Sequence, residues 1–282
     1  MGIEGPSGSG KTHLLYYLIC SCVLPHRFGG WNKVSVVFDT DGVFDVHRLQ
    51  TLLRARLPPS CDESIREQII SVALRNVHIF RPKSSLQLAA GLANLSSYHR
   101  HCLPTSEIAL LAIDSARSVY WPDRLAAEQS HTVNIVTPPP TTSNNPHQAI
   151  RTALWSFRRS HYPIIAILNW GPSLISVASN VPAFQLYKPF LPSRTSSFPY
   201  HTHVTSPFLT HQITLSSTRA GPSSDSVANE QGVTLPRHID VHVHIKTAVN
   251  RNELELLHMQ ITPEQVIITM ADSAYAADSE GQ

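Results

Sequence analysis

The sequence predicts an α/β fold in which a mostly parallel sheet is flanked by helices and interrupted by long loop insertions. Short apolar runs alternate with amphipathic helical patterns over residues 5–115. A glycine-rich segment separates the first short strand from an apolar helix. Residues 108–113 are continuously apolar, which is typical of a parallel strand covered on both faces.

Helices are predicted where apolar residues recur every three or four positions, and strands where short runs are apolar or β-branched. In chain order we expect a helix at 11–23, a strand at 34–38, helices at 44–57 and 62–75, a strand at 77–80, a helix from Ser84 or Ser85 to Ser97, a strand at 108–113, a helix at 147–161, and strands at 164–169, 210–216, 239–247 and 265–270. The predicted inward faces are Ile65, Ile69, Val72 and Ala73 in one helix and Ile150, Leu154 and Phe157 in another.

The length of 282 residues allows one large domain or two small ones, and we expect a single domain over residues 1–282. Thirteen of the 21 prolines lie between Pro138 and Pro236, so the second half should be richer in loops. Residues 125–146 and 171–207 are predicted loop-rich insertions, and 271–282 a frayed tail. The strand before the glycine-rich segment is reduced to residues 1–4, so we expect it to be truncated.

The composition argues against several classes of protein. Charged residues make up only 15% of the chain and the net charge is +2, which argues against a coiled coil, a highly charged disordered protein and a strongly basic nucleic-acid binder. No stretch approaches the ~20 apolar residues of a membrane span. Four cysteines without CxxC spacing indicate free thiols in a reducing compartment. We therefore expect an intracellular protein without a membrane partner.

The glycine-rich segment matches the pattern GxxxxGK[ST] at all eight positions: Gly5, Pro6, Ser7, Gly8, Ser9, Gly10, Lys11 and Thr12. Glycines let several backbone N–H groups turn toward one phosphate, and the next helix directs its positive dipole end at it. Lys11 would reach the β- and γ-phosphates of ATP, and the Thr12 hydroxyl would bind Mg²⁺. A chance glycine-rich turn is the alternative, and the helix that follows favours the phosphate loop.

Such a loop needs a carboxylate for the metal, at the end of a hydrophobic strand. Asp114 closes the apolar run at 110–113 and is our candidate. Asp39 and Asp41 end another strand that should neighbour the loop, and a carboxylate there could orient the attacking water; Asp41 is the candidate catalytic residue. Ordinary turn chemistry around Gly42 explains these two aspartates about as well.

Three segments together resemble the RecA-type recombinases, and among them the eukaryotic recombinase paralogues. They are the loop 5–12 running into 14–18, the segment 38–45 with 48–49, and 110–115 continuing through 120–124. The resemblance is clear over roughly residues 3–124 and weaker at 164–169 and 210–216. It implies a RecA-like P-loop NTPase core that binds ATP and Mg²⁺. It also implies a nuclear protein of homologous recombination and double-strand-break repair, which assembles with sister paralogues on single-stranded or junction DNA.

Two positions depart from the family pattern. Asp41 stands where recombinases carry Glu, so it would hold a water about one methylene away from the usual place. Trp170 falls near the position of a nucleotide-sensing Gln, and an indole donates one hydrogen bond but accepts none. The sequence therefore predicts ATP binding and leaves open whether the chain is a weak DNA-dependent ATPase.

Two other functions fit parts of the sequence. A small-molecule P-loop kinase fits the loop alone, although no basic lid motif is present, and a scaffold without nucleotide binding stays open. Asp240, His242 and His244 alternate on one strand face as in some metal sites, but a solvated face fits better. Arg151, Trp155, Arg158 and Arg159 lie off the apolar stripe of the 147–161 helix. They could contact single-stranded DNA, although a solvated face again fits better.

Overall fold

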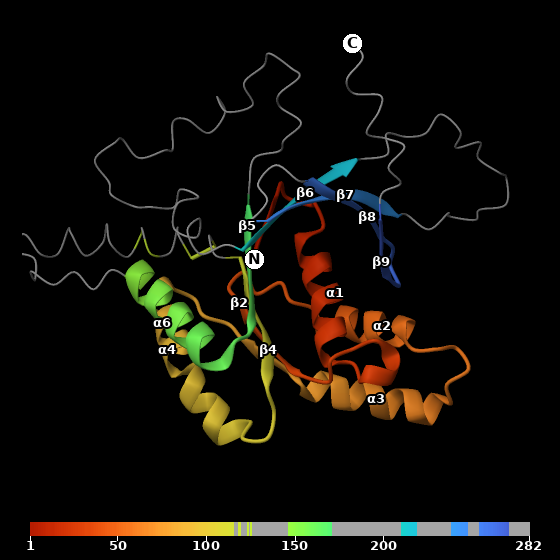
Figure 1. The fold of residues 1–282 in the computed structure, drawn as a ribbon, viewed down its shortest axis with the longest axis horizontal. Coiled ribbons are helices and arrows are strands. Elements are labelled where there is room, and N and C mark those ends of the chain that lie inside the picture. Colours follow the sequence, from red (N-terminus) through yellow and green to blue (C-terminus); the bar gives the residue numbers. More distant parts are fainter. Residues whose placement is uncertain are drawn as a thin grey trace, which may run out of the picture. The chain divides into compact units, whose positions relative to one another are not determined.

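The predicted strands and helices all occur in the computed structural model, in the predicted order (Figure 1). The structure describes residues 1–115, 118, 119, 123, 125, 146–170, 210–218, 238–247 and 254–270. Contacts divide the chain into two units, Thr12–Asn169 and Met1–Lys11 with Trp170–Gln282. The predicted insertions at 125–146 and 171–207 and the predicted tail lie outside the described residues, apart from Leu125 and Pro146. The single domain over the whole chain stays a prediction.

The unit Thr12–Asn169 is built on parallel strands. They are β2 (Val34–Asp39), β3 (Val77–Phe80), β4 (Ile108–Asp114) and β5 (Ile164–Trp170), in the spatial order β3-β2-β4-β5. The helices are α1 (Lys11–Val23), α2 (Val46–Arg56), α3 (Glu63–Arg75), α4 (Ser85–Cys102) and α6 (Pro146–His161). In Figure 1, α4 and α6 lie on one side of these strands, and α1, α2 and α3 on the other. The predicted α/β class, with a mostly parallel sheet flanked by helices, is confirmed.

Side-chain caps explain where the helices begin. The carboxylate of Asp45 accepts a hydrogen bond from the backbone N–H of His47 at 2.8 Å, which starts α2 two residues after the predicted position. Ser84 caps α4 by accepting from the N–H of Gln87 at 3.2 Å, one of the two caps predicted. The α4 helix then runs to Cys102, five residues beyond the predicted end.

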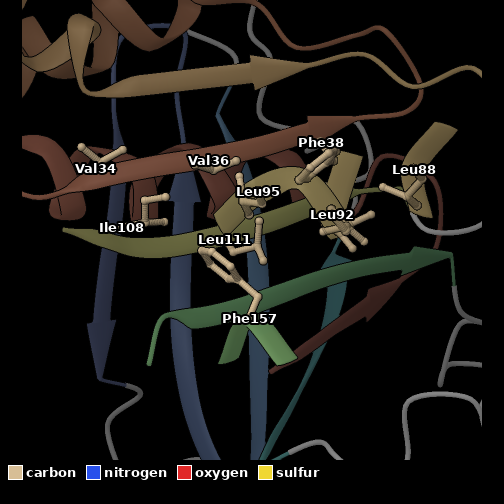
Figure 2. Packing of buried hydrophobic residues seen from close by; sticks show 10 residues of the cluster. Val34, Val36, Phe38, Leu88, Leu92, Leu95, Ile108, Leu111 and Phe157 are labelled. Atoms are coloured by element: carbon tan, nitrogen blue, oxygen red, sulfur yellow. The ribbon is translucent and has the colours of Figure 1, made fainter. Parts of the chain in front are cut away.

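The core of this unit lies between the strands and the α4–α6 layer (Figure 2). Its buried members are Val34, Val36 and Phe38 of β2, Ile108, Leu111 and Ile113 of β4, Leu88, Leu92 and Leu95 of α4, and Phe157 of α6. Ile150 and Leu154 pack against this cluster, so the predicted inward stripe of α6 is confirmed. Because strand side chains alternate, Asp39 and Asp114 point to the opposite face, where α1 lies.

The predicted inward face of α3 is wrong at two positions. Ile69 and Ala73 are buried as expected, but Ile65 is 46% and Val72 51% exposed. Ile70, at 1% exposure, takes their place, so the helix is rotated by roughly one residue. The prediction failed because Arg66, a charged residue, lies on the inward side of the helix. Its guanidinium donates to the carbonyls of 58, 59 and 61.

The unit of residues 1–11 and 170–282 is built on a mainly antiparallel set of strands. Here β1 (Gly2–Gly5) pairs in parallel with β6 (His211–Thr218), and β7 (Ile239–Thr247), β8 (Leu254–Ile261) and β9 (Val266–Met270) follow as antiparallel neighbours. The sequence did not predict β8. It consists mostly of Leu, Glu, Met and Gln, which favour helices, and only pairing with β7 and β9 makes it a strand.

No helix among the described residues is long and apolar enough to cross a membrane. All four cysteines are free thiols, as predicted. Burial raises the pKa of Cys20 and Cys22 to about 12 each, so both are packing groups of α1 and not reactive thiolates.

The core makes a sharp prediction for two leucines of α4. Leu92 is 2% exposed and belongs to the core cluster, whereas Leu86 is 70% exposed on the same helix. We expect Leu92→Ala to lower the free energy of unfolding by about 2–5 kcal/mol, because it removes buried methylenes and leaves a cavity. Leu86→Ala is the matched control and should change it by less than about 0.5 kcal/mol. Urea unfolding followed by circular dichroism measures both, and equal losses would contradict the described core.

A second prediction concerns His161, whose ring stacks on Phe157 at 4.3 Å and meets His99 edge-on at 5.0 Å. Burial, and then the neighbouring His99, lower the pKa of His161 below its ordinary 6.5. The folded chain therefore binds fewer protons than the unfolded chain, and the stability that His161 contributes above pH 6.5 is lost as the pH falls below it. We expect His161→Phe to flatten the dependence of the urea midpoint on pH between 6.5 and 5. An unchanged slope would contradict this.

Candidate nucleotide site

The loop that matches the phosphate pattern runs from the end of β1 to the start of α1. Gly8 and Gly10 adopt φ angles of 75° and 88°, which lie in the left-handed region that favours glycine. The N–H of Ser9 donates to the carbonyl of Pro6 at 3.3 Å, which closes the turn. Gly8 and Gly10 are therefore required by the path of the backbone.

Gly10 also lies against the apolar side of the C-terminal strands of its own unit. A methyl group at this position would come within 2.7 Å of Ile261 Cδ1, 3.1 Å of Met259 Cε and 3.4 Å of Val241 Cγ2. Val241 and Met259 are fully buried at adjacent positions of β7 and β8. Side chains of β7 and β8 thus pack against the loop at Gly10, and the absence of a side chain on Gly10 leaves room for them.

Lys11 and Ser9 provide the polar groups of the loop. The ammonium of Lys11 donates to the carbonyls of Gly5 at 2.9 Å and Pro6 at 2.7 Å. The hydroxyl of Ser9 is buried and has no hydrogen-bond partner among the described residues. A buried polar group without a partner is costly, and a ligand or water is the usual remedy. A cationic side chain, an unsatisfied hydroxyl and a helix N-terminus in one short loop fit a bound phosphate.

The two predicted metal ligands lie together within the unit Thr12–Asn169. The Thr12 hydroxyl donates to Asp114 Oδ2 at 2.9 Å, although 102 residues separate them in the sequence. One carboxylate and one hydroxyl form a partial ligand set, which suits Mg²⁺ because this ion takes its other ligands from phosphates and water. No group of three or more His, Cys, Asp or Glu among the described residues could hold a metal ion by itself.

Asp39 is the cross-strand partner of Asp114 at the carboxyl ends of β2 and β4. It is 1% exposed, and its two oxygens accept from the N–H groups of Val43 and Phe44 at 3.2 Å each. Arg81, just after β3, donates its Nε–H to Asp39 Oδ2 at 3.1 Å. Asp39 therefore stabilises the turn that follows β2, as the alternative interpretation of this segment expects. The positive charge of Arg81 compensates the buried carboxylate.

Asp41 is exposed in the turn between Thr40 and Gly42. Gly42, with φ at 71°, makes this turn possible. The carboxylate of Asp41 thus faces solvent beyond the end of β2, and its predicted role in orienting water stays a prediction.

Sequence reasoning missed two residues that shape the surroundings of the site. Arg81 could have been found, because β3 neighbours β2 in a parallel sheet and the residues that follow them meet at one edge. Tyr16 could not. Its hydroxyl accepts from the N–H of Asp45 at 2.8 Å and its ring packs on Phe44 at 4.9 Å, so it joins α1 to the start of α2. Burial raises the pKa of Tyr16.

The structure describes the other candidate residues only in part. Asp240, His242 and His244 lie half-buried on β7, and Asp240 is 3.4 Å from both His238 and His258, so this face is a network of polar contacts. On α6, Trp155 is half-exposed and Arg159 exposed. The side chain of Trp170 lies outside the described residues, as do Tyr120–Pro122 and Arg124. Asp123 is described, and its carboxylate accepts from the N–H of Ser85 at 3.1 Å at the start of α4.

Comparison with known proteins supports the resemblance. The chain is 36% identical over 127 residues to the mouse protein named DNA repair protein XRCC2, a match that covers 45% of this chain and 43% of that protein. It is 27% identical over 158 residues to the DNA repair protein XRCC2 homolog of Arabidopsis thaliana, covering 44% and 42%. The chain thus spans less than half the length of the curated relatives it matches.

No protein-family model matches the chain. The two relatives and the three motif segments nevertheless point to the same kind of protein, a recombinase paralogue. The α/β fold fits the RecA-like core that this similarity implies. The resemblance to the recombinase paralogues is thereby confirmed, and the chain is similar in particular to DNA repair protein XRCC2.

Proposed function

We propose that the chain binds ATP with Mg²⁺ through the loop Gly5–Thr12 and acts as a recombinase paralogue in homologous recombination and DNA repair. The observation that carries the nucleotide site is the 2.9 Å hydrogen bond from Thr12, the last residue of a complete phosphate-loop pattern, to Asp114. The names of the mouse and Arabidopsis relatives support the assignment to DNA repair.

The residues divide the work of binding. The backbone of the loop and the start of α1 would hold the phosphates, and Lys11 would exchange its bonds to Gly5 and Pro6 for phosphate oxygens. Thr12 and Asp114 would hold Mg²⁺, which when bound neutralises phosphate charge. Asp39 pairs with Arg81, and Asp114 is the carboxylate that contacts the hydroxyl of Thr12, so Asp114 is the proposed magnesium ligand.

We further propose that the nucleotide stabilises an assembly more than it drives turnover. Asp41 is one methylene shorter than the glutamate of the recombinases and faces solvent. The expected partners are one or more sister recombinase paralogues, in a hetero-oligomer that acts on single-stranded or junction DNA in the nucleus. With a net charge of +2 the chain offers little basic surface, so its DNA contacts should be local or shared with a partner.

Equilibrium binding of a fluorescent ATP analogue tests this proposal. We expect wild type to show magnesium-dependent binding and Lys11→Ala to lose it, because the ammonium that would face the phosphates is removed. Lys33→Ala is the matched control. This lysine pairs with Glu107 at the surface and should be replaceable without loss of binding.

The same variants test the assembly. Co-purification with a co-expressed recombinase paralogue should weaken for Lys11→Ala and not for Lys33→Ala. Weak, identical ATP binding by wild type and Lys11→Ala would overturn the nucleotide proposal and leave the scaffold alternative.

Phosphate release, with and without single-stranded DNA, tests how the nucleotide is used. We expect slow release by wild type, which Asp41→Asn lowers further while ATP affinity stays within about twofold, because an exposed carboxylate in the turn contributes little to ground-state binding. A panel of nucleosides should accept no phosphate. Rapid phosphorylation of any nucleoside would favour the kinase alternative and contradict the proposal.

A further inference from the structure

The strands β2 and β4 stay joined beyond their last residue pair, through Thr40. The N–H of Thr40 donates to the carbonyl of Asp114 at 2.7 Å. Its hydroxyl donates to the next carbonyl, that of Ser115, at 2.6 Å. One residue of the β2 end therefore holds two consecutive carbonyls of the segment that carries the candidate metal ligand.

Ser118 completes this arrangement from the other side of the turn. Its hydroxyl lies 2.6 Å from Thr40 Oγ1, to which it donates, and 2.9 Å from the carbonyl of Ser115. The N–H of Ser118 also donates to Ser115 O, at 3.3 Å. The Thr40 hydroxyl thus both donates and accepts, which uses its proton and one lone pair and fixes its rotamer.

The segment after Thr40 is held as well. The carboxylate of Asp39 accepts from the N–H groups of Val43 and Phe44, and Arg81 donates to the carbonyl of Phe44 at 3.2 Å. These hydrogen bonds restrict the motion of the segment that follows Thr40. It is a fixed point between the Asp39 turn and the turn that follows Asp114.

We propose, on the basis of the nucleotide site proposed above, that Thr40 is a positioning residue for the magnesium ligand Asp114. Its two hydrogen bonds fix the backbone on which the Asp114 carboxylate stands, so that Oδ2 meets the hydroxyl of Thr12. Partners behind a metal ligand raise metal affinity by fixing the orientation of that ligand. Thr40 itself touches neither the metal nor the nucleotide in this role.

The test measures magnesium dependence separately from nucleotide binding. With the full chain and a fluorescent ATP analogue, Mg²⁺ is titrated at fixed nucleotide, and nucleotide affinity is measured again in EDTA. Thr40→Val removes, at nearly constant shape, the hydroxyl that donates to Ser115 O and accepts from Ser118, and it should raise the Mg²⁺ midpoint about 3- to 10-fold. Thr40→Ser keeps the hydroxyl and should stay within about twofold. Affinity in EDTA should not change in either variant.

Two controls separate positioning from general damage. Thr51→Val removes a hydroxyl that donates to the carbonyl of His47 at 3.0 Å on α2, and should leave the Mg²⁺ midpoint unchanged. In the metal-free protein, hydrogen exchange at the Ser118 amide should accelerate in Thr40→Val and not in Thr40→Ser. If Thr40→Val does not fold, Ser118→Ala takes its place, with an expected rise of about 2- to 3-fold.

The outcomes distinguish this inference from the proposed function. An unchanged midpoint in Thr40→Val, or in Ser118→Ala where that variant is used, overturns the positioning role and leaves the nucleotide site standing. An equal loss in EDTA and in Mg²⁺ overturns it too, because it shows general damage. A wild type without magnesium-dependent binding overturns the proposed function and the positioning role with it.

Discussion

Two carboxylates lie side by side at the buried carboxyl edge of β2 and β4, and the surroundings of the site follow from the need to compensate both. Asp39 and Asp114 are cross-strand partners, at 1% and 5% exposure. Neighbouring parallel strands are about 4.8 Å apart, so like charges here repel strongly unless each finds partners. The parallel register of β2 and β4 pairs the last residues of the two strands, and it therefore brings the two carboxylates together.

The described contacts of the two carboxylates differ, and the roles proposed for them follow from these contacts. Asp39 receives two backbone N–H groups and the guanidinium of Arg81, which leaves it little capacity for a cation. Asp114 receives the hydroxyl of Thr12, a neutral partner that can share a metal ion with it. The contact with Arg81 suits a structural role for Asp39, and the contact with the Thr12 hydroxyl suits the magnesium role proposed for Asp114.

Most elements of the fold could be predicted because their sequence patterns are local. The helix at 11–23 and the strand at 77–80 have the predicted bounds, since apolar spacing and turn residues define them. The inward face of α3 could not be predicted, because Arg66 lies on the inward side and satisfies itself on nearby carbonyls. The same holds for the candidate site. The loop and Asp114 could be predicted from local patterns, but the contacts of Thr40 and Arg81 depend on which strands become neighbours.

The missed strand β8 shows what this dependence means for the phosphate loop. Met259 and Ile261 of β8 lie closest to the position that a side chain on Gly10 would occupy. A glycine with positive φ is explained by the loop alone, but the absence of space for a methyl group is explained only by strands some 240 residues later in the chain. Two separate constraints therefore require glycine at position 10. One is local and visible in the sequence, and the other arises only when the C-terminal strands pack beneath the loop.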